Sequence, residues 1–303
     1  MTAPTRILFV DDEERILRSL AMQFRRQYDV LTESDPRRAL ERLKSESVQI
    51  IVSDQRMPQM SGAEFLAQAS EIAPHTLRIL LTGYSDLDAA VDALNSGGIF
   101  RYLTKPWDQQ EMTNTLRQAA GIAASQVPVA MTDSAQPTTA LTVLLLDDHA
   151  ETLAAVGSFC HAGGHRLLHA RNLPEALLQL NTEAVDLLIS DLKLAGEDTA
   201  PLLKTLAQAH PRLLSLVVTP FQDTQALLRL INEAQIFRYL PKPIRPALFE
   251  KSLSAAARQA QAWRTQPTHV VARLAEAPKE ERERDKVGSL MGMLGRLRER
   301  LIA

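Results

Sequence analysis

An internal repeat constrains the fold of this chain more than any other feature. Residues 99–106 read IFRYLTKP, and residues 236–243, which lie 137 positions later, read IFRYLPKP. Other polar residues recur at nearly the same spacing: Asp11-Asp12 with Asp147-Asp148, Asp54 with Asp191, and Thr82 with Thr219. Self-similarity at a fixed period indicates repeated structural units. We therefore expect two copies of one domain, each about 120 residues long.

Short apolar runs alternate with segments of helical periodicity in the first copy. The runs cover residues 7–10, 30–32, 50–53, 77–81 and 100–103, and the amphipathic segments include 13–24, 36–45, 63–73 and 111–124. Apolar strands that alternate with helices indicate a parallel sheet covered on both faces. The sequence thus predicts an α/β protein with two doubly wound, five-stranded parallel-sheet domains. In such a fold the site lies at the carboxyl ends of the strands.

Changes in composition predict where the domains begin and end. We expect a first domain at residues 1–124, a second at 141–264, and between them a linker at 125–140 that is rich in Pro, Ser, Thr and Ala. Residues 265–303 form a short C-terminal helical tail. Its apolar residues recur every three or four positions, as in a heptad seam: Val287, Leu290, Leu294, Leu297 and Leu301. This seam either docks on the second domain or serves self-association or a partner helix.

Composition limits the classes of function. The formal net charge is −2, which argues against a protein that mainly coats nucleic acid or lipid. Cys160 is the single cysteine, so the sequence holds neither an intrachain disulfide nor a cysteine-built zinc site. No apolar run reaches the roughly 18 residues of a membrane span, and no signal peptide is recognisable. We expect a cytoplasmic protein that does not enter the membrane.

Three carboxylates are predicted to meet in the first copy. Asp11 and Asp12 follow the first strand and Asp54 follows the third, and these strand ends are neighbours in this fold. Crowded carboxylates repel one another unless a cation compensates, and Mg²⁺ suits such oxygen ligands. Thr82 and Lys105 follow the fourth and fifth strands. A hydroxyl and an ammonium beside carboxylates and a divalent cation form a site that can hold and transfer a phosphoryl group.

These residues resemble the signature of a two-component receiver domain, which has a flavodoxin-like fold. The surrounding words extend the resemblance: VDDE at 10–13, SDQRMP at 53–58, LTGY at 81–84 and RYLTKPW at 101–107. The wording is most similar to receivers of response regulators that carry HD-GYP or hydrogenase-regulator outputs. Taken singly, an aspartate after a strand is equally well a helix cap. Five such residues in order, in two copies, favour the receiver interpretation.

The resemblance implies a role for each residue of the first copy. Asp54 is the phosphoacceptor, which receives a phosphoryl group from a sensor histidine kinase or phosphotransfer protein. Thr82 and Lys105 bind the phosphoryl oxygens, and Tyr102 is the switch residue that turns inward when Thr82 moves. The implied Mg²⁺ ligands are Asp11, acting largely through water, with Asp12, Asp54 and the backbone carbonyl of Arg56.

The second copy carries the same set with departures around it. Asp191 is the implied phosphoacceptor, and the other implied residues are Asp147 and Asp148 for the metal, Thr219 and Lys242 for the phosphoryl group, and Thr219 and Tyr239 for the switch. Pro220 stands where the first copy has Gly83, and proline has no backbone N–H to offer a phosphoryl oxygen. We expect Asp191 to be phosphorylated more slowly than Asp54, or not at all. His149 is expected to be a surface helix residue rather than a metal ligand.

The sequence predicts output through protein contacts. Only 39 residues follow Arg264, which is short for a DNA-binding or enzymatic domain with its own core. Phosphorylation is expected to change the binding of a downstream protein or of a second copy. Two alternatives stay open, a phosphate sink for a kinase and a transcription regulator that binds DNA through its tail, although nucleic acid is the less favoured partner. Beyond its own phosphorylation and dephosphorylation, no enzymatic activity is expected.

Overall fold

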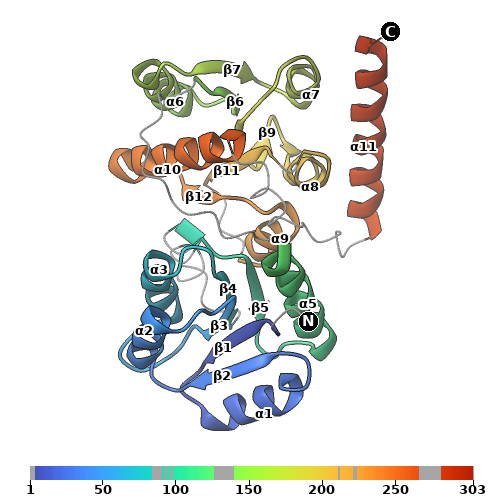
Figure 1. Cartoon of the computed structure of the whole chain (residues 1–303). Coiled ribbons are helices and arrows are strands. Elements are labelled where there is room, and N and C mark those ends of the chain that lie inside the picture. Colours follow the sequence, from blue (N-terminus) through green and yellow to red (C-terminus); the bar gives the residue numbers. More distant parts are fainter. Residues whose placement is uncertain are drawn as a thin grey trace. The chain divides into compact units, whose positions relative to one another are not determined.

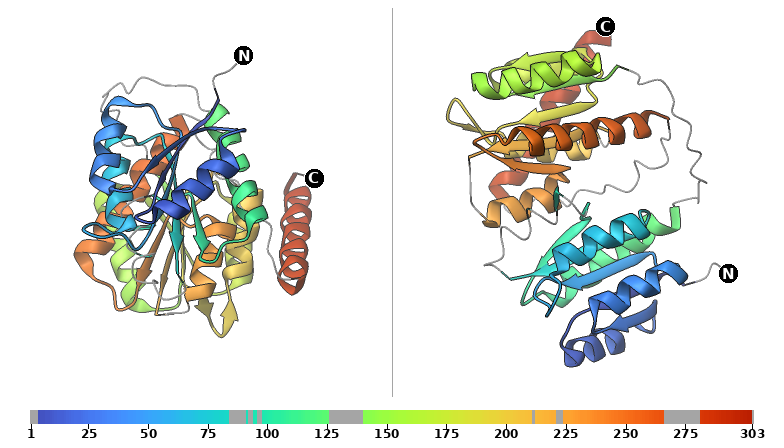
Figure 2. Two further views of the ribbon diagram at one scale, coloured as in Figure 1. Left: turned by 90° about the horizontal axis from the view of Figure 1, so that it is seen from below. Right: turned by 90° about the vertical axis from the view of Figure 1, so that its left-hand side faces the viewer.

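The chain divides into two units, Met1–Pro128 and Val129–Ala303. The fold is taken from a computed structural model that describes residues 4–83, 91, 94–95, 98–125, 140–210, 212–220, 224–265 and 281–302. Each unit contains one five-stranded sheet with helices on both of its faces (Figures 1 and 2). This arrangement confirms the predicted α/β class. Most of the predicted linker at 125–140 lies outside the described residues.

Strands and helices alternate in the N-terminal unit as the sequence predicts. The strands are β1 (Arg6–Val10), β2 (Asp29–Glu33), β3 (Ile50–Asp54), β4 (Leu77–Thr82) and β5 (Arg101–Thr104). The helices include α1 (Glu14–Phe24), α2 (Pro36–Ser45), α3 (Gly62–Ile72) and α5 (Gln109–Ser125). The strand order is β2-β1-β3-β4-β5 and every pair is parallel. Helices α2 and α3 lie together on one face of the sheet and α5 lies on the other (Figure 1).

Local signals explain where helices begin. The Asp35 side chain caps α2 by accepting a hydrogen bond from the Arg37 backbone N–H, and Pro36 occupies the first turn, where its missing N–H costs nothing. At the start of α3, Ser61 and Glu64 form a reciprocal capping box. These caps fix the turns that lead from β2 into α2 and from the loop after β3 into α3.

The C-terminal unit repeats the topology. Its sheet strands are β6 (Thr142–Leu146), β7 (Arg166–Ala170), β8 (Leu187–Ser190), β11 (Leu214–Thr219) and β12 (Arg238–Pro241), in the order β12-β11-β8-β6-β7. The flanking helices are α6 (Ala150–Gly163), α7 (Leu173–Thr182), α8 (Ala200–Ala209), α9 (Thr224–Ala234) and α10 (Pro246–Thr265). Apolar strands and helices pack Cys160, 2% exposed, and Trp263, 4% exposed, into the core. Burial raises the pKa of the Cys160 thiol to about 11.

A short hairpin distinguishes the second unit and was not predicted. Strands β9 (Lys193–Leu194) and β10 (Glu197–Asp198) pair antiparallel between β8 and α8. Ala195 and Gly196 form the turn with φ values of 50° and 85°, the left-handed region that glycine adopts freely. The hairpin occupies the segment in which the first copy has Met57-Pro58.

The tail contains a helix, α11 (Glu281–Ile302), which packs against α8 and α7 of the second unit. Val287 and Leu294 of the predicted seam are each 5% exposed. This packing favours a seam that docks on the second domain over one that serves self-association or a partner helix. Residues 266–280, and the side chains of Leu297 and Leu301, lie outside the part of the chain that the structure describes. Within the described part, no helix combines the length and apolar composition that a membrane span needs.

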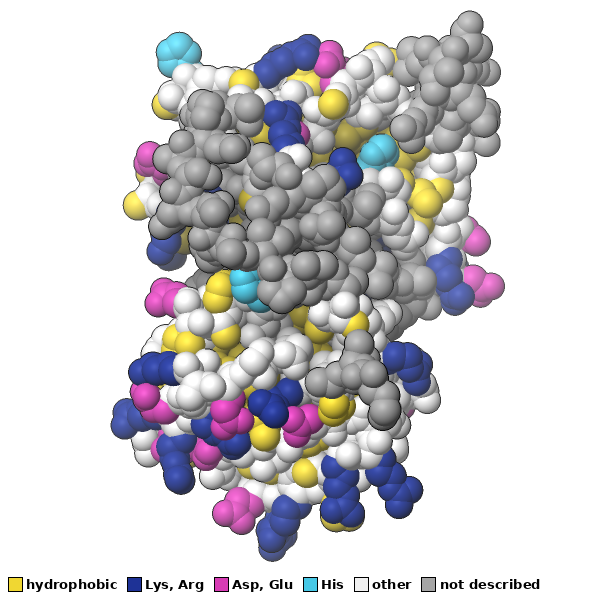
Figure 3. Space-filling view, viewed as in Figure 1, with side chains coloured by type: hydrophobic (Ala, Val, Ile, Leu, Met, Phe, Trp, Pro, Cys, Tyr) yellow, Lys and Arg dark blue, Asp and Glu magenta, His cyan; other side chains and the backbone are white. Residues whose placement is uncertain are grey.

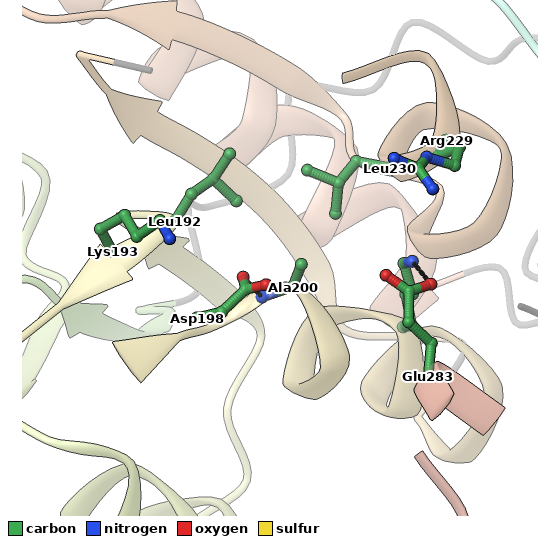
Figure 4. Close-up of a pocket in the computed structure, with 8 residues that line it drawn as sticks. Leu192, Lys193, Asp198, Ala200, Arg229, Leu230 and Glu283 are labelled. Carbon is green, nitrogen blue, oxygen red and sulfur yellow. Dashed lines mark hydrogen bonds and ion pairs between the residues drawn. The ribbon is translucent and has the colours of Figure 1, made fainter. Parts of the chain in front are cut away.

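A buried charge cluster joins α11 to the second unit. Lys204 on α8 is 2% exposed, and its Nζ lies 2.8 Å from a carboxylate oxygen of Glu233 on α9, itself 1% exposed. Lys204 also forms a short ion pair with Glu283 of α11, drawn as the dashed line in Figure 4. The pairing borders a cavity of about 140 Å³ whose wall includes Leu192, Asp198 and Arg229. We call Lys204, Glu233 and Glu283 the tail cluster.

Charged side chains cover the N-terminal unit on the face that Figure 3 presents. Toward the left of this face Lys and Arg side chains lie among Asp and Glu, and toward its lower right edge Lys and Arg predominate. Mixed charges of this kind match the nearly balanced composition of the chain.

Candidate functional site

In the first unit, side chains from neighbouring strand ends meet around one ammonium group. Asp11 follows β1, Asp54 ends β3, and Lys105 follows β5. The Lys105 Nζ lies 2.6 Å from Asp54 Oδ1 and 3.2 Å from Asp11 Oδ2. Both carboxylates are nearly buried, at 5% and 1% exposed for the two residues. The ammonium therefore compensates two carboxylates that would otherwise repel each other in a poorly solvated place.

Hydrogen bonds fix the remaining oxygens of these carboxylates. Asp11 Oδ1 accepts the backbone N–H of Glu13 at 2.9 Å, and Asp54 Oδ2 accepts that of Arg56 at 3.2 Å. Burial nevertheless dominates at Asp11 and raises its pKa, although the Glu13 amide and Lys105 oppose the shift. Burial alone would lower the pKa of Lys105, but its contacts with Asp54 and Asp11 outweigh burial and raise it. Lys105 is therefore charged at neutral pH.

Gly62 lets helix α3 begin directly against the Asp54 backbone. A Cβ at this position would lie 2.1 Å from the Asp54 carbonyl oxygen, far inside van der Waals contact. The Gly62 N–H also donates to the Gln55 carbonyl at 2.9 Å. The close approach holds Asp54, the last residue of β3, and the loop that carries Arg56 tightly against the helix.

Thr82 and Tyr102 lie on the two strands next to β3 on one side of the sheet, β4 and β5. Thr82 is the last residue of β4 and is 1% exposed; its hydroxyl donates to the Gly83 carbonyl at 3.2 Å. Tyr102 on β5 is 2% exposed. The centre of the Trp107 ring lies 5.9 Å from the Lys105 Nζ, a contact that the sequence analysis did not predict. Its position two residues after the lysine was the available signal for this cation–π contact.

The second unit builds the same arrangement around Lys242. Its Nζ lies 2.6 Å from Asp191 Oδ2 and 2.9 Å from Asp147 Oδ2, and both aspartates are buried. Burial tends to raise the pKa of Asp191, but hydrogen bonds from Lys242, Thr219 and the Lys193 amide outweigh it and lower the pKa. Thr219 and Tyr239 are buried, at 0% and 5% exposed. Burial, followed by the charge of Asp191, raises the pKa of Tyr239.

Thr199 replaces the glycine of the first unit. Its position, counted by the repeat, matches Gly62, and its hydroxyl donates to the Asp191 backbone carbonyl at 2.5 Å. The same carbonyl accepts from the Ser190 hydroxyl at 2.7 Å. A side chain thus lies at the position where the first unit has none and where its helix begins directly against the backbone.

Each unit gathers side chains that suit a divalent cation. Oxygens of Asp11, Asp12 and Asp54 lie within 4.8 Å of one another in the first unit. This all-carboxylate set fits Mg²⁺, which takes oxygen ligands and keeps several waters. In the second unit the corresponding group is Asp147, His149 and Asp191. Asp148, an implied ligand there, is exposed and lies 2.9 Å from His149 Nδ1.

Comparisons with known proteins agree with this geometry. The response regulator receiver domain matches residues 7–117 and 143–254, more than half of the chain, so the chain belongs to the response regulator receiver family and carries two receiver domains in tandem. The predicted resemblance to tandem receivers is thereby confirmed. Receiver domains are signalling domains rather than metabolic enzymes, and they bind Mg²⁺ through acidic residues.

The individual relatives match a stretch of this chain no longer than one receiver domain. The hydrogenase transcriptional regulatory protein HoxA of Bradyrhizobium diazoefficiens is 37% identical over 113 residues, which is 37% of this chain and 23% of that protein. The DNA-binding transcriptional regulator NtrC of Escherichia coli is 41% identical over 80 residues, 26% of this chain and 17% of that protein. The chain thus spans less than a quarter of the length of either curated relative.

A solved receiver structure is also similar. The signal receiver domain of an HD domain-containing protein from Pseudomonas fluorescens Pf-5 is 40% identical, covers 41% of this chain and 93% of that chain, and gives a TM-score of 0.40. HoxA bears one of the two kinds of name that the sequence wording predicted, that of a hydrogenase regulator.

Proposed function

We propose that the protein is a response regulator in which Asp54 accepts a phosphoryl group from a sensor histidine kinase or phosphotransfer protein. The observation that carries this proposal is the Lys105 ammonium, which lies 2.6 Å from Asp54 and 3.2 Å from Asp11. An ammonium held against the acceptor carboxylate is positioned to meet an incoming phosphoryl oxygen. Thr82, at the end of the adjacent strand, offers a hydroxyl to another oxygen.

Mg²⁺ would be held by Asp12 and Asp54, by the Arg56 carbonyl, and by Asp11 through water. When bound, it supplies positive charge that offsets the charge of the transferring phosphoryl group. Asp54 Oδ1 attacks the phosphorus atom, and the bond from phosphorus to the histidine nitrogen of the donor protein breaks as the new O–P bond forms. Lys105 shifts from the carboxylate toward one phosphoryl oxygen, and the Thr82 hydroxyl donates to another. Tyr102 then moves with Thr82 as the switch residue.

Intact mass after incubation with a small phosphodonor and Mg²⁺ tests this proposal. We expect Asp54→Asn to remove the phosphoryl adduct of the first receiver, because an amide lacks the nucleophilic oxygen. Asp29→Asn, which removes a partly exposed carboxylate on β2, is the matched control and should leave the adduct unchanged. The comparison is made in chains that carry Asp191→Asn. An adduct of the same size with and without Asp54→Asn in this background would refute the assignment.

In the second receiver we propose that Asp191 is a slower acceptor, with Thr219, Lys242 and Tyr239 in the corresponding roles and Asp147 and Asp148 at the metal. Pro220 follows Thr219 and has no backbone N–H for a phosphoryl oxygen. The lost charge-assisted hydrogen bond is worth roughly 1.5–3 kcal/mol, or about tenfold to a hundredfold in rate.

Exchanging Pro220 and Gly83 tests whether the missing backbone N–H accounts for slower phosphoryl uptake at Asp191 than at Asp54. In an Asp54→Asn background, Pro220→Gly is expected to raise the rate of phosphoryl uptake at Asp191 by about tenfold or more. In an Asp191→Asn background, Gly83→Pro should lower uptake at Asp54. Both rates come from intact mass against time. Unchanged rates in both exchanges would mean that the backbone N–H at this position contributes nothing.

We propose that the output is a phosphorylation-dependent protein contact, with a downstream protein or a second copy. Helix α11 packs Val287 and Leu294 against α8 and α7 of its own unit, so the proposed contact does not depend on the heptad seam. HoxA and NtrC are named transcriptional regulators, yet the matched regions cover only 23% and 17% of their lengths. Light scattering on the phosphorylated samples distinguishes self-association, which raises the mass, from binding that needs another protein.

A further inference from the structure

The two receivers hold the backbone of the acceptor aspartate in different ways. In the first, α3 begins at Gly62, whose missing side chain lets the helix lie directly against the Asp54 carbonyl. In the second, the corresponding residue is Thr199, which is buried and directly precedes α8. Its hydroxyl donates to the Asp191 carbonyl at 2.5 Å. The position of Asp191 therefore depends on a hydrogen bond from the start of α8 rather than on direct contact with a helix.

Further hydrogen bonds tie the segment between Asp191 and Thr199 to both the acceptor and the helix. The Lys193 amide donates to Asp191 Oδ1 at 3.2 Å, and the Thr199 N–H donates to the Leu192 carbonyl at 3.1 Å. The Thr199 carbonyl in turn accepts the Leu203 N–H of α8 at 3.1 Å. A displacement of α8 therefore moves Thr199, and with it the carbonyl of Asp191.

Helix α8 is covered on a face that the first receiver leaves accessible to solvent. It packs against both α9 and α11, and residues 201–206 are all buried. Three of these buried residues have counterparts in α3 that are exposed or partly exposed: Glu64, Ala67 and Gln68 correspond to Pro201, Lys204 and Thr205. The docked tail thus contributes to holding the helix on which the position of Asp191 depends.

The tail also reaches the segment that follows Asp191. Leu192, Lys193 and Asp198 of this segment line the same cavity as Glu283 of α11, as Figure 4 shows. Glu283 pairs with Lys204, which lies near the start of α8. Because a buried ion pair strongly resists the loss of one partner, the tail cluster fixes α11 against the part of α8 that is closest in sequence to Thr199.

We propose that docked α11 positions Asp191 for phosphoryl transfer, acting through α8 and the Thr199 hydroxyl, so that loss of docking slows uptake at Asp191 but not at Asp54. The inference rests on the proposed function in requiring Asp191 to accept a phosphoryl group, and it adds a role for the tail. Its route passes through neither Thr219 nor Tyr239, the residues proposed for the switch. A small misplacement of a reacting group lowers the rate strongly, which is why a distant helix matters here.

Undocking the tail tests the proposal in the full chain. Val287→Asp places a charge at a buried position of α11, and Met293→Asp, at a position that is 41% exposed, is the matched control. In Asp54→Asn chains, Val287→Asp is expected to slow phosphoryl uptake at Asp191 by about two- to tenfold, the equivalent of one neutral hydrogen bond. Met293→Asp should leave this rate unchanged. In Asp191→Asn chains, neither variant should change uptake at Asp54, and intact mass against time gives all rates.

Thr199 provides the test of the route. Thr199→Val keeps the shape of the side chain and removes the hydroxyl, so it is expected to slow uptake at Asp191 by a similar factor, whereas Thr199→Ser should restore the rate. Adding Val287→Asp to Thr199→Val should have little further effect, because the bond through which α11 acts is already absent. A general loss of stability would instead slow both chains equally. Hydrogen exchange of the Lys193 and Thr199 amides should also rise in Val287→Asp without any phosphodonor.

Two kinds of result would overturn the role of the tail. One is an uptake rate at Asp191 that Val287→Asp leaves unchanged, or slows equally in chains with and without Thr199→Val. The other is uptake at Asp54 with none at Asp191 in any chain, which removes this inference and leaves the assignment of Asp54 intact. Absence of uptake at both aspartates would contradict the proposed function itself.

Discussion

Lys204→Ala is expected to lower the free energy of unfolding of the C-terminal unit by about 3–5 kcal/mol, the usual cost of breaking a buried ion pair on one side. The Glu233 carboxylate is 1% exposed and lies 2.8 Å from the Lys204 Nζ. Neither Glu233 oxygen makes a hydrogen bond within the described residues. Removing the ammonium leaves a buried negative charge without compensation, and it also removes the partner of Glu283 on α11.

Urea unfolding of the full chain measures the loss of unfolding free energy, and tryptophan fluorescence assigns it to the C-terminal unit. The sequence has two tryptophans, Trp107 in the first unit and Trp263 in the second, so Trp107→Phe leaves fluorescence that reports the C-terminal unit alone. Lys204→Met combined with Glu233→Leu is the matched control. It removes both charges together and is expected to cost less than Lys204→Ala. A loss below about 1 kcal/mol for Lys204→Ala would show that the tail cluster is not the buried pair described above.

The second large effect is on phosphoryl transfer. Lys105→Ala is expected to slow phosphoryl uptake at Asp54 by about a hundredfold or more, the usual effect of removing one preorganised electrostatic contact. Lys105 contacts both Asp54 and Asp11, and these contacts raise its pKa, so its charge is present throughout the neutral range. Without it, an incoming phosphoryl group meets two uncompensated carboxylates.

Uptake rates by intact mass, in an Asp191→Asn background, measure the effect. Lys44→Ala on α2 is the matched control, because its ammonium is 56% exposed and pairs only with neighbouring Glu41 among the described residues. The Lys44 variant should match the parent rate. Far-ultraviolet circular dichroism confirms that both variants remain folded. Uptake in Lys105→Ala within about threefold of the parent would contradict the role of this ammonium.

Much of the fold and of the candidate site could be predicted from the pattern of apolar and polar residues in the sequence. Buried strands of a parallel sheet leave continuous apolar runs, so β1, β3 and β4 were predicted to within a residue or two at each end. The carboxyl ends of such strands meet at one edge, which is why Asp11, Asp54 and Lys105 were placed together before any coordinates. The repeat carried the same inference to the second unit.

Contacts between distant residues were not predictable in the same way. The tail cluster brings together residues from three helices: Lys204, Glu233 and Glu283. The first copy has no charged pair that would have suggested it, because its positions corresponding to Lys204 and Glu233 are Ala67 and Ser96. A lysine within the apolar segment Ala200–Ala209 was a signal that could have been noticed, although it names no partner. The hairpin β9–β10 depends on left-handed backbone at Ala195, which alanine rarely adopts. The direction of the His149 ring depends on a rotamer rather than on sequence spacing.

Chemical trapping of the acyl phosphate tests the central claim most directly. Borohydride reduces the phosphorylated carboxyl group of an aspartate to the alcohol of homoserine, and peptide mass mapping then locates the altered residue. After incubation of the wild-type chain with a small phosphodonor and Mg²⁺, we predict homoserine at position 54, with less or none at position 191. Homoserine at another aspartate, with position 54 unchanged, would contradict the assignment of Asp54 as the phosphoacceptor.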